Sequence, residues 1–214
     1  MGTCNDQLWS HGNDWRWRVL DNYVIMPITI NGSGTVTGIS VGGLPDGCVD
    51  ADTLAAGAGG ISVADQWRST ANTTASGDTD ITNWERVDGT GQGTLGTGMS
   101  HSSGVFTFPS TGIWLVQCWC VALYDGDARR WTQLEFQVST DSGSNWSRQS
   151  MSYDSIPDTS SSTNSLNYND SMMDVTNTST YRLKITVGGE SNYEWRGDSN
   201  HNQNAITFIR LGDT

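Results

Sequence analysis

Few side chains of this sequence are spaced in a way that could hold a metal ion. His11, His101 and His201 fall in three separate segments, with no histidine four residues away and no cysteine nearby, so a zinc site is not indicated. Aspartates gather at residues 46–52 and 125–127, but neither group follows the pattern of a calcium-binding loop. We predict no metal and no cofactor: calcium could find oxygen ligands here, but no motif indicates it.

Catalytic arrangements also lack a motif. Serines are plentiful, yet no Gly-x-Ser-x-Gly elbow presents one of them as a nucleophile. Glu135, Glu190 and Glu194 could supply two carboxylates for glycoside hydrolysis, but Glu135 falls on a regular strand face and nothing fixes a separation. We therefore predict that the protein is not an enzyme, and a small depolymerase is an alternative without a motif behind it.

One short motif has a structural explanation. Residues 139–146 fit the pattern Ser-x-Asp-x-Gly-x-x-Trp, in which Asp141 can accept bonds from backbone amides, Gly143 supplies a positive φ and Trp146 covers the turn. The pattern resembles the Asp-box turn of sialidases and other β-propeller proteins, where it is structural and repeated. A single copy predicts a stable hairpin.

The polar loop at residues 188–204 carries the candidate receptor contacts Tyr193, Trp195, Arg196 and His201. Exposed aromatic rings among Asn, Asp and His would form a patch that stacks on sugars. The alternative is that the rings close the end of the domain. The same loop contains Arg196-Gly197-Asp198, a copy of the integrin-binding tripeptide, but so short a sequence recurs by chance.

The elements that would position these residues are organised around residues 104–123, GVFTFPSTGIWLVQCWCVAL. The β-branched and aromatic content, together with the break at residues 109–112, favours a strand over a helix. Both faces of that strand are apolar, so its outer face needs a cover that a neighbouring subunit could provide. One face forms either a subunit interface or the core, and it carries Trp114, Val116, Cys118 and Cys120.

Two later segments alternate cleanly between apolar and polar residues. We predict strands there with Leu134, Phe136 and Val138 inward in the first, where Gln133, Glu135 and Gln137 point outward. In the second, the inward residues are Tyr181, Leu183, Ile185 and Val187. With 25 glycines and only 16% charged residues among 214, the composition is typical of an all-β protein with many turns.

Charge and cysteine usage exclude several classes of partner. The formal net charge is −12 and Lys184 is the only lysine, so there is no basic stripe for nucleic acid. No apolar run is long enough to insert into a membrane, and no secretory leader pattern opens the chain, which predicts folding in a cytoplasm. Cys118 and Cys120 are predicted to be buried thiols, and a disulfide between Cys4 and Cys48 is left open.

We predict two parts, an N-terminal attachment arm or linker at residues 1–60 and a head domain at residues 61–214. The arm is too small to own a core, and Asn31-Gly32 within it predicts a hairpin turn. Three tryptophans lie near its start and would either anchor the chain to a partner or pack back on the domain: Trp9, Trp15 and Trp17.

The head resembles the globular head of complement and the tumour-necrosis-factor-like jelly rolls. The resemblance runs from about Val63 to Asp213 and rests on GVFTFP at 104–109, GIW at 112–114 and AITFIRLG at 205–212. More narrowly, residues 98–112, the FIRLGD ending and the arm segments ING, GLPDG and DADTLA look like structural and fibre proteins of tailed bacteriophages. The resemblance implies an antiparallel jelly-roll β-sandwich that trimerises through the sheet holding both termini.

From these observations we predict a homotrimeric virion component of a tailed bacteriophage, either a tail or head fibre or a capsid decoration protein. Its arm would attach it to other virion proteins, with assembly in the host bacterial cytoplasm, and its head would project and could contact the host surface. The alternative is a lectin-like module that binds a receptor or glycan.

Overall fold

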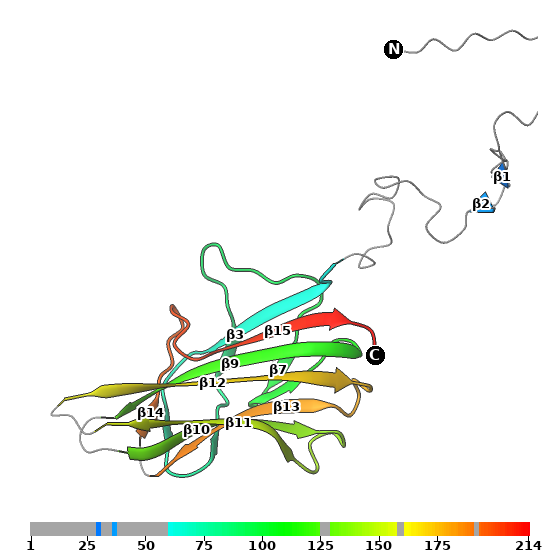
Figure 1. Ribbon diagram of the computed structural model, residues 1–214. Helices are drawn as coiled ribbons and strands as arrows, with labels where there is room; N and C mark the ends of the chain where they lie inside the picture. Colours follow the sequence, from blue (N-terminus) through cyan, green and yellow to red (C-terminus); the bar gives the residue numbers. More distant parts are fainter. Residues whose placement is uncertain (1–28, 31–35, 38–59, 125–128, 158–160, 191–192) are drawn as a thin grey trace, which may run out of the picture. The chain divides into compact units, whose positions relative to one another are not determined.

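Every secondary-structure element that the structure describes is a β-strand. The computed structural model describes residues 29–30, 36–37, 60–124, 129–157, 161–190 and 193–214. Strands β1 (Thr29–Ile30) and β2 (Val36–Thr37) pair antiparallel, as the hairpin signal between them predicts. The remaining strands form two antiparallel sheets that lie face to face (Figure 1), so the predicted all-β sandwich is confirmed.

One sheet has six strands. Its order is β11 (Ser147–Ile156), β10 (Arg129–Ser139), β13 (Arg182–Gly189), β8 (Val105–Thr107) and β7 (Ser100–Ser102), and β5 (Thr79–Asp80) also pairs with β13. The residues predicted to point inward from the two alternating segments are buried, which confirms those predictions.

The other sheet has seven strands, and β9 (Gly112–Tyr124) lies in its middle. Along one edge of β9 runs β12 (Thr163–Val175), and along the other run β15 (Ala205–Gly212) and β14 (Tyr193–Trp195). Beyond these lie β3 (Val63–Ser69), β6 (Trp84–Arg86) and β4 (Thr73–Ala75). The stretch predicted to be the organising strand is therefore divided at Pro109: β8 joins the six-stranded sheet and β9 the seven-stranded one.

Aromatic rings fill the space between the sheets. Phe106 of β8 packs against Phe208 of β15 with ring centroids 5.1 Å apart, and Phe108 meets the edge of Trp114 at 5.2 Å. Such offset and edge contacts add to the gain from burying the rings. This core covers the inner face of each sheet and leaves the other face of each pointing outward.

The sandwich begins and ends at the same place. Val63 of β3 pairs with Arg210 of β15, near the end of the chain, so both ends of the sandwich leave from one end of the seven-stranded sheet (Figure 1). Residues 1–28 lie outside the described residues, and the predicted arm stays a prediction.

Candidate functional site

Strand β9 presents two different faces. Its even-numbered side chains, including Trp114, Val116, Cys118 and Cys120, are fully buried between the two sheets. Sequence analysis left two roles open for these four residues, and the structure places them in the core. Only the opposite parity of the same strand faces outward.

The odd-numbered side chains of β9 lie on the outer face of the sheet and are only partly covered. The register with β12 places Met172 opposite Leu115, Tyr168 opposite Trp119 and Leu166 opposite Val121. On β12 these side chains are well exposed: Leu166 58%, Tyr168 48% and Met172 63%. Apolar surface of this kind, continuous across neighbouring strands, marks an interaction site more often than a solvated face.

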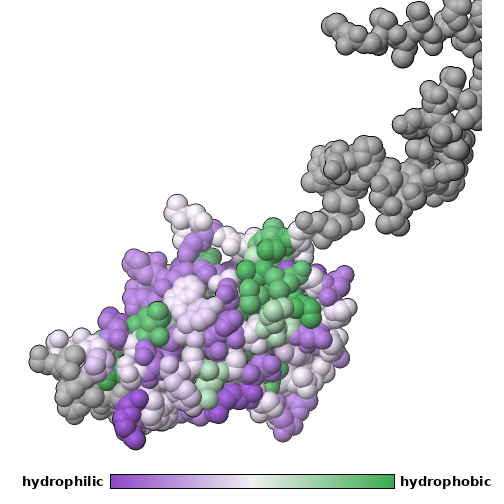
Figure 2. All heavy atoms as spheres, viewed as in Figure 1, coloured by the Kyte–Doolittle hydropathy of each residue, from purple (hydrophilic) through white to green (hydrophobic). Residues whose placement is uncertain are grey.

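The register continues the apolar surface across the whole sheet. From Met172 it runs through Leu115 to Ile209 of β15, then to Ala64 of β3, and ends at Leu95, which bridges to Ala64 and is 50% exposed. Figure 2 shows an apolar area over the ends of β3, β15 and β9. We call the surface made by the following residues the apolar face: Leu95, Ile113, Leu115, Trp119, Val121, Leu166, Tyr168, Met172, Ile209 and Leu211.

Polar side chains also lie on this face. Gln117, Thr207 and Gln66 form a row that is bonded within the chain, and two exposed carboxylates, Asp170 and Asp174, lie opposite Gln117 and Ile113. Gln117 donates its side-chain amide to the Tyr168 hydroxyl at 2.7 Å, and Gln66 donates to the Thr207 hydroxyl at 2.8 Å. Groups that are already paired lose little when water is removed from them. These two bonded pairs therefore do not prevent a partner from covering the part of the face on which they lie.

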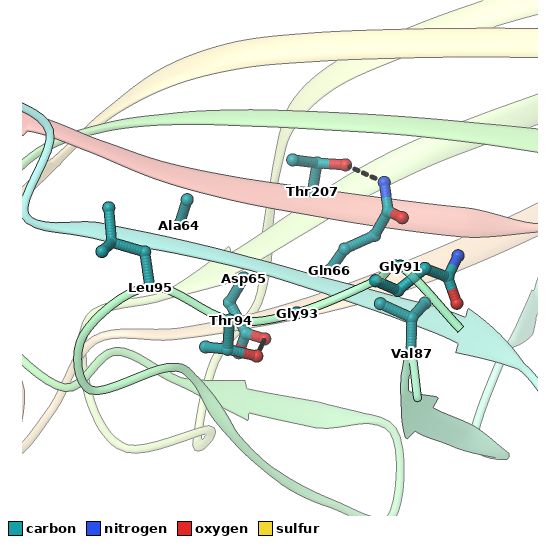
Figure 3. Close-up of a pocket in the computed structure, with 10 residues that line it drawn as sticks. Ala64, Asp65, Gln66, Val87, Gly91, Gly93, Thr94, Leu95 and Thr207 are labelled. Atoms are coloured by element: carbon teal, nitrogen blue, oxygen red, sulfur yellow. Dashed lines mark hydrogen bonds between the residues drawn. The ribbon is translucent and has the colours of Figure 1, made fainter. Parts of the chain in front are cut away.

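A pocket of about 560 Å³ lies at the β3 side of the apolar face (Figure 3). Ala64, Gln66 and Thr207 form one side of it, and the loop that contains Gly91 to Leu95 forms another. The loop is fastened to β3 by two backbone bonds between Ala64 and Leu95, of 3.1 and 2.8 Å. Leu95 belongs to both the pocket and the apolar face, so the pocket is a recess at the edge of that face.

Asp65 secures the strand and loop that frame the pocket. Its buried carboxylate accepts bonds from the Arg86 guanidinium, the Trp67 indole, the Thr94 hydroxyl and the Met99 amide, at 2.7–3.2 Å. The Arg86 guanidinium also lies 4.7 Å above the Trp67 ring. All of these donors belong to the same chain, which gives the carboxylate a structural role.

The candidate receptor contacts of residues 188–204 are not an exposed aromatic patch. Tyr193 and Trp195 are buried and pack edge to face at 5.8 Å, with Trp195 opposite Ala122 of β9. Burial raises the pKa of Tyr193. The alternative that these rings close the end of the domain is the one the structure has, and only Arg196 and His201 keep exposed surface.

The Arg196-Gly197-Asp198 tripeptide is held by its own chain. Arg196 pairs with Glu194, the Gly197 amide donates to Asn72, and Asp198 accepts from the amides of Asn200 and His201. Those bonds, the Asn200 amide first, lower the pKa of Asp198. The tripeptide therefore has a structural role, since its bonds hold the loop in place.

The predicted hairpin at residues 139–146 is confirmed. Asp141 accepts from the Asn145 side chain and backbone and from the Ser139 hydroxyl, and Gly143 has φ +92°. The bonds from Asn145, side chain first, lower the pKa of Asp141 to about 2. Lys184 lies 4.8 Å above the Trp146 ring and fixes the hairpin to the six-stranded sheet.

Several sequence-based predictions stand apart from this surface. Cys118 and Cys120 are buried free thiols with their sulfurs 3.8 Å apart, as predicted. Trp9, Trp15, Trp17, Cys4 and Cys48 lie outside the described residues. Within the described ranges no three metal-binding side chains come together, and no helix there has the length and apolarity to cross a membrane.

The contribution of β12 to the apolar face was not predicted from the sequence. Leu166 and Tyr168 alternate with Ser165, Asn167 and Asn169, which reads as an apolar inward side and a polar outward one, but the structure has the reverse. The polar side is buried because Asn167 donates to Thr132 at 2.8 Å and Asn169 to the Leu134 carbonyl at 3.3 Å, both across the sandwich. The long alternation indicates a strand, but which of its two sides faces the core depends on these distant partners.

No protein-family model matches the chain, and no curated protein matches it. Solved structures do match the chain. The chain is similar to the Eiger TNF of S. frugiperda, with a TM-score of 0.57 and 12% identity over 72% of this chain and 95% of that one. It is also similar to murine APRIL, with a TM-score of 0.50 and 13% identity over 70% of this chain and 98% of that one. At these identities the likeness shows the fold alone, and that fold is the tumour-necrosis-factor-like jelly roll.

Proposed function

We propose that the protein is a homotrimeric structural component of a tailed-bacteriophage particle, a fibre or a capsid decoration protein, and that its copies associate through the apolar face. The observation that carries the self-association is the unbroken register of apolar side chains from Met172 to Leu95. A single copy leaves these side chains partly in water, and a second copy of the chain can bury them.

The two ends of the apolar face differ, which favours a ring. The β12 end projects Leu166, Tyr168 and Met172, whereas the β3 end holds the pocket behind Leu95. A contact between unlike surfaces repeats from copy to copy, and it closes into a ring when the rotation between neighbouring copies divides a full turn. The number three comes from the resemblance to tumour-necrosis-factor-like jelly rolls.

The place on a virus particle rests on the motifs of the sequence. The arm segments and the FIRLGD ending look like those of tailed-phage structural proteins, and the net charge of −12 argues against nucleic acid as the partner. In this proposal residues 1–60 attach the protein to other virion proteins, with Trp9, Trp15 and Trp17 as anchors. Assembly takes place in the host bacterial cytoplasm and the head projects from the particle.

The test is the mass in solution. Sedimentation velocity of the full chain should give about three times the 23.2 kDa of one copy. Tyr168→Asp places a charge in the apolar face and should yield folded monomers. Tyr153 lies on the opposite sheet with a similar exposure of 60%, so Tyr153→Asp is the matched control and should leave the trimer intact. A monomeric wild type, or a Tyr168→Asp variant of unchanged mass, would overturn the proposal.

A further inference from the structure

A pair of aromatic rings stands on the outer face of the six-stranded sheet. Trp131 of β10 and Tyr153 of β11 lie with their ring centroids 6.3 Å apart and their planes at 83°. Tyr153 is the most exposed of the described tyrosines at 60%, and Trp131 is partly exposed. The two perpendicular rings form a corner, in which a ligand can lie flat on the face of one ring and contact the other ring from the side.

A bulge in β10 lies next to this corner. Arg129 pairs with Ile156 and Thr132 with Asp154, so β10 has one more residue than β11 between these pairs. Bulges redirect side chains and occur often beside binding sites. Because Thr132 points into the sandwich and bonds Ser165 and Asn167, Trp131 is left on the outer face.

Fixed polar groups lie directly beside the rings. The register places Gln133 opposite Tyr153, and Gln133 donates to Asp78 at 2.6 Å and to Glu135 at 2.9 Å. Arg148 pairs with Glu135 while keeping 48% of its side chain exposed. The polar groups are therefore held in place by their own network before any ligand arrives, which lowers the entropic cost of binding.

We propose that this corner is a binding site for a neutral saccharide, with the apolar C–H face of a pyranose ring on Trp131 or Tyr153. Aromatic rings offer flat apolar area at little entropic cost, and the exposed part of the Arg148 guanidinium can donate to sugar hydroxyls. A net charge of −12 disfavours sulfated or sialylated chains, and this selects neutral ones.

The site lies on the sheet opposite to the apolar face and does not depend on the proposed self-association. When copies associate through the seven-stranded sheet, the six-stranded sheet stays exposed on each of them. Several copies held together would bind a repetitive polysaccharide with an avidity well above the affinity of one site. Weak single-site binding is thus sufficient for a surface that contacts glycans.

The experiment begins with the full-length protein on a printed array that contains neutral, sialylated and sulfated oligosaccharides. We expect retention of neutral hexose oligosaccharides. The strongest of these then serves as the probe in calorimetric titrations. Trp131→Ala and Tyr153→Ser should each weaken its affinity by about tenfold, the loss expected from removing one stacked ring. Tyr153→Phe keeps the ring and should stay within about twofold.

Gln149→Ala, an exposed substitution on the same strand, is the control and should bind as wild type does. Tyr153→Ser is safe for folding because the ring is largely in water, so it decides the matter if Trp131→Ala misfolds. No retention of any neutral saccharide would overturn the proposal. So would binding that neither substitution changes, because the rings would then only stabilise the β10–β11 pair. The Tyr168→Asp monomer should keep the single-site affinity and lose the avidity, which separates this proposal from that of the trimer.

Discussion

The outer faces of the six-stranded and seven-stranded sheets differ in how far their outward side chains are covered. On the six-stranded sheet, Glu135 points outward yet is fully buried, because Gln133, Gln137 and Arg148 bond it and cover it. On the seven-stranded sheet, the outward residues of β9 are apolar except for Gln117, and their neighbours on β12 stay exposed. One face is covered within the chain, whereas the other keeps apolar side chains exposed.

Burial on an outer face requires partners, and on these two sheets the chain supplies polar partners but not apolar ones. Four side chains complete the Glu135 network from β10 and its surroundings. Nothing in the described part of the chain covers Met172 or Leu166. The difference predicts that substitutions on the first face change folding and that substitutions on the second change assembly.

The largest effect should be the protection of the thiols. In a chain carrying Cys4→Ser and Cys48→Ser, the remaining Cys118 and Cys120 are in the core, and burial raises the pKa of Cys118 well above its usual range. We expect them to react with a colorimetric disulfide reagent at least about a thousandfold more slowly in the folded protein than in denaturant.

The monomeric Tyr168→Asp variant should protect these thiols equally well, since they face the core. Rapid labelling of that variant, with protection only in the assembled wild type, would return Cys118 and Cys120 to the subunit interface and reverse the assignment of the two sides of β9.

A smaller effect should come from removing Glu135, the acceptor of the polar network on the six-stranded sheet. Glu135→Leu removes the acceptor for two glutamine amides and for Arg148, and leaving such donors unpaired should cost about 3 kcal/mol of unfolding free energy. Denaturant titrations at one protein concentration measure this loss of unfolding free energy. Glu135→Gln keeps an acceptor oxygen and should lose less. A leucine variant as stable as wild type would mean that this face is not held by the network.

The smallest effect should be a pH dependence at the hairpin that joins β10 to β11. The pKa of Asp141 is about 2 in the folded chain against 3.8 ordinarily, so its bonds stabilise the fold fully above about pH 4. That stability is lost as the pH falls from 4 toward 2. The difference in unfolding midpoint between wild type and Asp141→Asn should shrink over this range, while other carboxylates affect both proteins alike. A difference that is constant with pH would argue against the hydrogen bonds of Asp141 as its cause.

Much of the fold could be predicted because alternation is local. Leu134 and Ile185 point inward as their spacing indicates, and the Ser139 to Trp146 motif forms its hairpin. For β9 the two sides were separated correctly, but the sequence could not tell which is the core, since both are apolar. That choice depends on which sheet packs against Trp114, and this is set by residues far along the chain.

The candidate sites were harder to predict because burial depends on distant partners. Trp195 lies in a polar loop segment, yet pairing with Ala122 of β9 draws it into the interior. Trp131 and Tyr153 are 22 residues apart in sequence, and only the β10–β11 register brings their rings together. The arrangement of pairs across the sheets, which composition does not encode, decided both outcomes.

The pairing of Val63 with Arg210 has a practical consequence for engineering. A cargo peptide fused after Thr214 would emerge at the same pole as the segment that precedes β3, and the turns at the far pole would remain unencumbered. Ligation of the two ends through a short bridge, with new ends opened in a distant turn, would give a circular permutant that keeps every strand of the sandwich.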